Sequence, residues 1–108
     1  MKIKRAAGIR GTRFIHVLSP CPTGWKIPES MSPKVAVAAV ETNIFPLYEI
    51  FDGLNFTITH ESKNLPVETY LNLQGRYKHL TDDEVKEIQG ETDQIWSDLQ
   101  AKAAKKSC

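Results

Sequence analysis

A short apolar run that ends at two prolines constrains this chain more than any other feature of its sequence. Residues 14–18 read Phe-Ile-His-Val-Leu, and Ser19 leads from them into Pro20, Cys21 and Pro22. The run is rich in β-branched and aromatic residues, which predicts a strand buried on both faces, as in the middle of a parallel sheet. Each proline fixes its own φ and keeps the preceding residue out of the helical region. We therefore expect Cys21 on a stiff extended turn at the carboxyl edge of that sheet, where α/β proteins bind ligands.

Charge and cysteine content exclude several classes of protein. The formal net charge is +1, which gives no general attraction to nucleic acid or to an acidic membrane. No apolar run approaches the roughly 20 residues that span a bilayer. Two cysteines make no disulfide framework, and nothing resembles a secretory signal, so a reducing cytoplasm is expected. At 108 residues the chain has the length of a single domain.

The amino-terminal stretch is basic and is expected to be the tail of a helix. Residues 1–13 carry five Lys or Arg side chains and no acid, and Ile3, Ala6 and Ala7 recur at helical spacing. Cations near the carboxyl end of a helix suit its dipole. A mitochondrial presequence or a nucleic-acid-binding arm would share this composition, but here the stretch runs directly into the apolar run.

Three further segments carry helix signals. Pro33 suits the first turn of an apolar helix over 34–41, and Pro66 begins a short helical stretch within 65–75. Thr81 with a glutamate three residues later forms a capping box, which starts a longer helix. The mostly apolar stripe of that last helix is expected to pack in the core and consists of Val85, Ile88, Thr92, Ile95, Trp96 and Leu99.

A hairpin is predicted in the middle of the chain. Asp52 and Gly53 lie between two segments with strand composition, and this pair is a strong signal for a two-residue type I′ turn. In that register Phe51 pairs with Leu54, and Phe51 shares a face with Phe56. One face of the hairpin should pack against the rest of the chain, and the other should be wet.

The sequence contains no complete catalytic motif of the common kinds. The chain has no Gly-rich phosphate loop, no His-Glu-x-x-His, no Cys-x-x-Cys and no Gly-x-Ser-x-Gly. We expect His16 to be a hydrogen-bonded core histidine, and His60 and His79 to be surface residues. Trp25 is expected either to cap the sheet edge or to stack on a ligand. No residue of this chain is predicted to be catalytic.

Cys21 admits two interpretations. It is either a small buried hydrophobe or a metal ligand. An iron-sulfur centre takes about four thiolates, and Cys108, on a Lys-rich tail, is a poor second. Any metal role for Cys21 therefore requires ligands from outside this chain.

Five stretches carry a resemblance to a known family. They run over 14–25, 39–42, 45–49, 66–68 and 73–77. In the same order they resemble the carboxyl-terminal part of the β subunit of pyruvate:ferredoxin oxidoreductase, also called pyruvate synthase. The resemblance implies a subunit that binds thiamine diphosphate with magnesium and a [4Fe-4S] cluster. It also implies an enzyme that converts pyruvate, coenzyme A and oxidised ferredoxin to acetyl-CoA, carbon dioxide and reduced ferredoxin.

One residue of the family's sites has a counterpart here. Cys21 matches the late cluster ligand, whereas the earlier cysteines and the Gly-Asp-Gly motif for diphosphate and magnesium have none. Alone, the chain is therefore expected to bind no cofactor, and its expected partners are the other subunits of the oxidoreductase complex, with ferredoxin. Met1 falls inside an apparent internal helix of the family, which favours a truncated or split reading frame.

The resemblance also implies the fold class. We expect an α/β chain that is a carboxyl-terminal fragment of a thiamine-diphosphate-binding fold, with one buried parallel strand, helices and a β-hairpin. Residues 1–108 would form a single partial domain with an exposed edge where the rest of the subunit packs. The alternative function is a non-catalytic truncated remnant or assembly module without iron.

Overall fold

Helices dominate the structure. The computed structural model describes residues 2–104. The α-helices are α1 (Lys2–Ala7), α2 (Pro22–Trp25), α3 (Ser32–Glu41), α4 (Glu68–Leu71) and α5 (Asp82–Ala104). Two 3-10 turns are η1 (Glu29–Met31) and η2 (Gly75–Tyr77), and the strands are β1 (Tyr48–Phe51) and β2 (Asn55–Ile58). The fold is therefore mixed helix and strand, with one two-stranded antiparallel sheet among the described residues.

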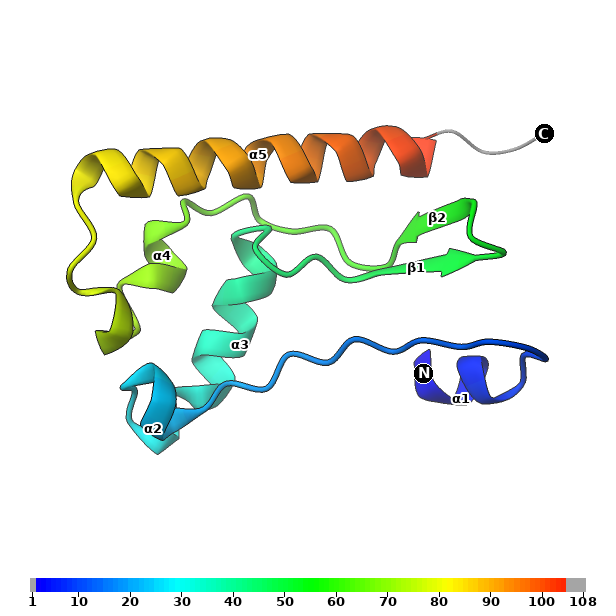
Figure 1. Cartoon of the computed structure of the whole chain (residues 1–108), viewed down its shortest axis with the longest axis horizontal. Helices are drawn as coiled ribbons and strands as arrows, with labels where there is room; N and C mark the ends of the chain where they lie inside the picture. Colours follow the sequence, from blue (N-terminus) through cyan, green and yellow to red (C-terminus); the bar gives the residue numbers. More distant parts are fainter. Residues whose placement is uncertain (1, 105–108) are drawn as a thin grey trace.

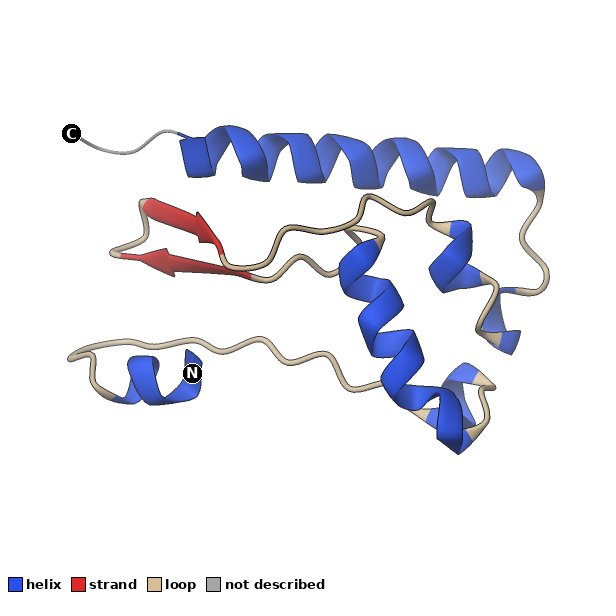
Figure 2. Cartoon of the chain, turned by 180° about the vertical axis from the view of Figure 1, so that it is seen from behind, coloured by secondary structure: helices blue, strands red, loops and turns tan. Residues whose placement is uncertain are grey.

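The elements lie in two layers along the long axis of the molecule. Helix α5 runs along one side, above α4 and the hairpin, and an extended segment joins α1 to α2 along the opposite side (Figure 1). The view from behind shows α3 crossing between these layers (Figure 2). Within residues 2–104, no helix is long and apolar enough to cross a membrane.

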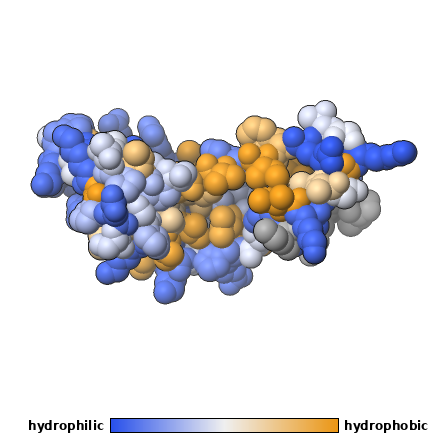
Figure 3. Space-filling model, turned by 90° about the horizontal axis from the view of Figure 1, so that it is seen from below, coloured by the Kyte–Doolittle hydropathy of each residue, from blue (hydrophilic) through white to orange (hydrophobic). Residues whose placement is uncertain are grey.

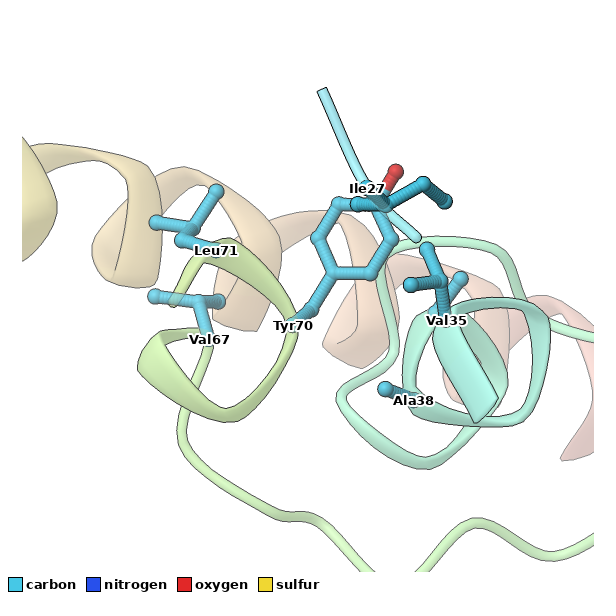
Figure 4. Packing of buried hydrophobic residues seen from close by; sticks show 7 residues of the cluster. Ile27, Val35, Ala38, Val67, Tyr70 and Leu71 are labelled. Carbon is cyan, nitrogen blue, oxygen red and sulfur yellow. The ribbon is translucent and has the colours of Figure 1, made fainter. Parts of the chain in front are cut away.

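The hydrophobic core lies where α3, α4 and the loop after α2 meet. Its buried members are Ile27, Val35, Ala38, Ala39, Val67, Tyr70 and Leu71. The ring of Tyr70 points from α4 toward Ile27 and Val35, and this contact joins three separate segments (Figure 4). Both predicted helical segments, 34–41 and 65–75, thus contribute buried residues, although α4 itself is a single turn.

The start of α5 confirms the predicted capping box. The backbone N–H of Glu84 donates to Oγ1 of Thr81 at 3.2 Å, and the backbone N–H of Thr81 donates to Oε1 of Glu84 at 3.5 Å. The predicted core stripe is only partly buried, because Leu99 is 8% exposed but Ile95 is 62% exposed. One end of α5 packs on β2, where Nζ of Lys102 lies 5.3 Å from the centre of the Phe56 ring.

The hairpin forms, but its register differs from the predicted one. Asp52 and Gly53 both have positive φ, as a type I′ turn requires, yet Phe51 pairs with Asn55 and not with Leu54. The extra loop residue places Phe56 opposite Ile50, on the other face from Phe51. A shift of one residue exchanges the two faces of a strand, and this register turns Phe56 toward α5.

The predicted buried parallel strand over 14–18 is wrong for this structure. The segment is extended but belongs to no sheet, and the side chains of Phe14 and Val17 are 85% and 70% exposed. The prediction of His16 as a core residue is wrong for the same reason, since this side chain is exposed. A buried strand needs neighbours on both edges, and the two strands described here pair only with each other.

The molecule is more open than a compact domain of its length. Its radius of gyration is 15.8 Å, whereas a compact chain of this length has about 13 Å. It exposes 7995 Å² of surface, against about 6,100 Å² for a folded monomer of its mass. Much apolar surface therefore remains uncovered within this chain.

Candidate functional site

Cys21 has the extended backbone conformation that the two prolines predict. Its backbone has φ −105° and ψ 109°, and it caps the amino end of α2. Its sulfur accepts a hydrogen bond from the backbone N–H of Gly24 at 3.4 Å, and its carbonyl accepts one from Trp25 at 2.9 Å. The thiol is free and the residue is exposed, so the interpretation of Cys21 as a buried hydrophobe is wrong. No parallel sheet supports the turn within residues 2–104.

The turn is tied to a second segment 50 residues later. Lys26 closes α2 in the left-handed region, and its carbonyl accepts the backbone N–H of Gly75 at 3.1 Å. The guanidinium of Arg76 lies over the ring of Trp25, 3.9 Å from its centre. Trp25 therefore packs against η2. The expectation that it caps a sheet edge is wrong for this structure. Sequence alone gave no sign of this pairing, because the partners are far apart in the chain.

The described residues fit one ligand of an iron-sulfur cluster and not a whole cluster. Within residues 2–104, no group of three or more His, Cys, Asp or Glu side chains could hold a metal ion. Cys108 lies outside the described residues. The exposed sulfur of Cys21, with one N–H directed at it, suits a thiolate that binds a metal held mainly by other groups.

A second polar cluster joins the end of α3 to the loop after β2. Oε1 of Glu41 lies 2.9 Å from Nε2 of His60, and Nζ of Lys63 lies 3.8 Å from Oε2 of Glu41. The hydrogen bond from His60 is the main cause that holds the pKa of Glu41 below its ordinary value, and it outweighs burial, which raises it. The carbonyl of Glu41 also accepts the backbone N–H of Leu65 at 2.9 Å. This cluster fixes the loop over 60–65 to the helix.

The sequence did not single out the contact between Glu41 and His60. The two residues are 19 positions apart and lie on either side of the hairpin, and no local motif connects them. The prediction that His60 and His79 are surface residues is confirmed, since both are exposed. His60 nevertheless has a partner that places it at the edge of the core.

The extended segment before Cys21 presents an apolar face. Ile15 is 46% exposed and Val17 is 70% exposed, while the ring of His16 lies 5.0 Å from that of Phe45. Among the described residues, the backbone of 10–20 makes no hydrogen bond with other backbone groups. Apolar side chains gather on this side of the molecule (Figure 3). The segment is thus held on one face by its own chain, with its other face and its edges open.

Comparison with known proteins identifies relatives over most of the chain. No protein-family model matches it. The chain is 49% identical over 89 residues to pyruvate synthase subunit PorB of Methanocaldococcus jannaschii, which is 82% of this chain and 30% of that protein. It is 37% identical over 100 residues to ketoisovalerate oxidoreductase subunit VorB of Pyrococcus furiosus, with 91% of this chain and 32% of that protein covered.

A third relative has a different substrate in its name. The chain is 44% identical over 86 residues to the β subunit of NADH-dependent phenylglyoxylate dehydrogenase of Aromatoleum evansii, which is 78% of this chain and 19% of that protein. The chain spans about a third, or less, of the length of the curated relatives it matches. These similarities confirm the resemblance to pyruvate synthase β subunits.

Proposed function

This chain is related to a part of the β subunits of pyruvate synthase and ketoisovalerate oxidoreductase, and from that premise we propose that it works as one part of a 2-oxoacid:ferredoxin oxidoreductase. It supplies the Cys21 thiolate to a [4Fe-4S] cluster and a packing surface to the rest of the β subunit. The observation that carries this proposal is the similarity over 82% of the chain, together with an exposed sulfur on a fixed turn.

The surroundings of Cys21 support a ligand role. A ligand to a cluster whose other ligands lie outside these residues must be exposed on the surface of this segment, and Cys21 is exposed. Hydrogen bonds from the backbone to cluster sulfurs are among the features that set cluster potentials, and the N–H of Gly24 already points at this sulfur. Two flanking prolines limit the ways in which the turn can move.

The extended segment supports the proposal that this chain supplies a packing surface to the rest of the β subunit. Residues 14–18 form part of an extended segment (Figure 1) with exposed apolar side chains and no backbone hydrogen bond among the described residues. A peptide that adds to the edge of another sheet has these same properties. The surplus of exposed surface, about 1,900 Å² over that of a compact monomer, exceeds the area of about 800 Å² that each partner contributes to a stable protein interface of standard size. The proposed occupant is the part of the β subunit that this chain does not match.

The proposed substrates and cofactors come from the relatives. Pyruvate and coenzyme A are the proposed substrates, and ferredoxin the proposed electron acceptor, on the similarity to pyruvate synthase subunits. The relatives at 37–49% identity are named for pyruvate, ketoisovalerate and phenylglyoxylate, and this range of names supports the proposal that residues outside this segment select the 2-oxoacid. Thiamine diphosphate with magnesium would be held by residues outside this chain, because the chain lacks the Gly-Asp-Gly motif.

Iron analysis of the assembled complex tests the ligand role. The chain is co-expressed anaerobically with its complementary subunits, by which we mean the unmatched part of the β subunit and the other subunits of the complex. Iron content and visible absorption are then compared for the wild type, Cys21→Ser and Cys108→Ser. Serine keeps an oxygen that can accept the N–H of Gly24, so Cys21→Ser removes the thiolate while preserving the cap. We expect Cys21→Ser to lose cluster iron and Cys108→Ser to retain it. Equal iron in all three complexes would contradict the proposal.

The alternative function is a non-catalytic remnant or assembly module without iron. It is favoured by the presence of only one thiol, with no metal-holding group, among residues 2–104. This alternative predicts a complex that assembles through the 14–18 segment and contains no iron attributable to this chain. The same set of variants separates the two functions, because only the first predicts a difference between Cys21→Ser and Cys108→Ser.

A further inference from the structure

The backbone that carries Cys21 is braced by a contact that admits only glycine at one position. A Cβ placed on Gly75 would lie 2.7 Å from Cβ of Lys26, closer than real contacts allow, and 3.0 Å from the carbonyl oxygen of Lys26, which is tighter than most. Gly75 does not have positive φ, so its backbone conformation is open to other residues. Space, and not conformation, therefore requires glycine here, and the close approach permits the hydrogen bond from Gly75 to Lys26.

The residue after this glycine holds the same turn from the side. The guanidinium of Arg76 lies over the rings of Trp25 and Tyr77, 3.9 and 4.6 Å from their centres. Nε of Arg76 donates to Oε1 of Gln74 at 2.8 Å, and Gln74 is itself 2% exposed and bound to the backbone of Tyr70 at 3.0 Å. The position of the guanidinium is thus fixed from the core, and it in turn fixes the indole ring of Trp25.

The two contacts meet at the cysteine turn. The backbone N–H of Trp25 donates a hydrogen bond to the carbonyl of Cys21, and the backbone N–H of Gly24 donates one to the Cys21 sulfur. We propose that Gly75 and Arg76 are positioning residues for Cys21, which hold its sulfur at one place and angle through Lys26 and Trp25. This proposal rests on the proposed role of Cys21 as a cluster ligand. It assigns the 73–77 stretch a role in positioning Cys21 that no sequence motif in this stretch predicts.

Two variants and two controls test the positioning role in the co-expressed, anaerobic complex. Gly75→Ala forces Lys26 away, and its control is Gly90→Ala, where an added Cβ has no atom within 4 Å. Arg76→Lys keeps the charge but loses the planar group that stacks on Trp25. Its control is Arg5→Lys, which alters an exposed contact with Glu49 at the other end of the molecule (Figure 1).

The readouts are the rate of cluster bleaching in air and the EPR spectrum of the reduced cluster, which reports ligand geometry. We expect bleaching about tenfold faster in both variants, the lower end of the effects seen for residues that orient metal ligands, with altered EPR spectra and unchanged subunit association. Both controls should match the wild type.

The outcomes separate this proposal from the one on which it rests. If Cys21→Ser loses iron while Arg76→Lys keeps the wild-type spectrum and bleaching rate, the positioning role is wrong and the ligand role stands. If Cys21→Ser itself retains the cluster unchanged, the ligand role is wrong. Failure of Gly75→Ala to assemble, with Arg76→Lys behaving as the wild type, would also contradict the positioning role.

Discussion

The two sides of this molecule both carry apolar residues such as valine, but these are buried on one side and exposed on the other. On the side of α3 and α4, valines such as Val35 are fully buried and the backbone is paired. On the side of the extended segment, Val17 is 70% exposed and the backbone of 10–20 has no backbone partner among the described residues. Composition does not distinguish the two sides. The difference lies in whether this chain supplies the surface against which each must pack.

The largest expected effect is a difference in stability between the same substitution, valine to alanine, made on each of the two sides. Val35→Ala removes two methyl groups from a site that is 0% exposed, and we expect it to lower the free energy of unfolding by about 2–3 kcal/mol. Val17→Ala should change it by less than about 0.5 kcal/mol in the isolated chain. Chemical denaturation of the purified chain measures both. Similar losses for the two variants would show that the segment packs within this chain after all.

In the assembled complex, a substitution in the extended segment should no longer be neutral. In the complex with its complementary subunits, Val17→Ala is expected to weaken association, because the proposed interface covers this side chain. Amide hydrogen exchange over 14–18 supplies a second measurement, and it should be fast in the isolated chain and slow in the complex. Exchange that stays fast in the complex would exclude strand addition by this segment.

An intermediate effect is expected at the start of α5. Thr81→Ala removes the oxygen that accepts the N–H of Glu84, and it should cost about 1 kcal/mol of stability. Thr12→Ala, at an exposed position in the open region, is the matched control and should be close to neutral. Denaturation midpoints of the two variants give the comparison. A cost at Thr12 equal to that at Thr81 would place the open region inside the cooperative fold.

The smallest expected effect concerns pH and the contact of Glu41 with His60. Because the pKa of Glu41 is lowered in the folded chain, its contribution to stability is present above its ordinary value of 4.5 and is lost as the pH falls through the folded value. His60→Ala should shrink this acid-dependent loss, and His79→Ala should leave it unchanged. The effect should be small, because the side chain of His60 is 44% exposed. Denaturation at a series of acid pH values tests it, and identical pH profiles for wild type and His60→Ala would contradict it.

Signals confined to a few neighbouring residues predicted the structure well. The capping box at Thr81, the proline in the first turn of α3 and the turn at Asp52 and Gly53 all appear where the sequence placed them. Each depends on hydrogen bonds or φ restrictions within about four residues, so no distant partner is needed. The extended backbone at Cys21 is predicted correctly for the same reason, but the sheet edge on which it was expected does not form within residues 2–104.

Features that depend on distant partners were not predicted. Residues 14–18 have strand composition, but a strand is defined by its neighbours, and residues 2–104 provide none for this segment. The contacts of Arg76 with Trp25 and of Glu41 with His60 join residues that no motif connects. In the hairpin, one extra loop residue was enough to exchange its two faces. The ligand role of Cys21 came from family resemblance and remains a proposal.

The uncovered face of the 14–18 segment carries a consequence for the living cell. Mostly apolar segments whose backbone donors and acceptors are unpaired tend to pair with copies of themselves and form intermolecular cross-β stacks. When the surface that covers this segment is missing, the chain is therefore expected to aggregate or to be captured by chaperones. Co-expression with that surface should raise the yield of soluble chain.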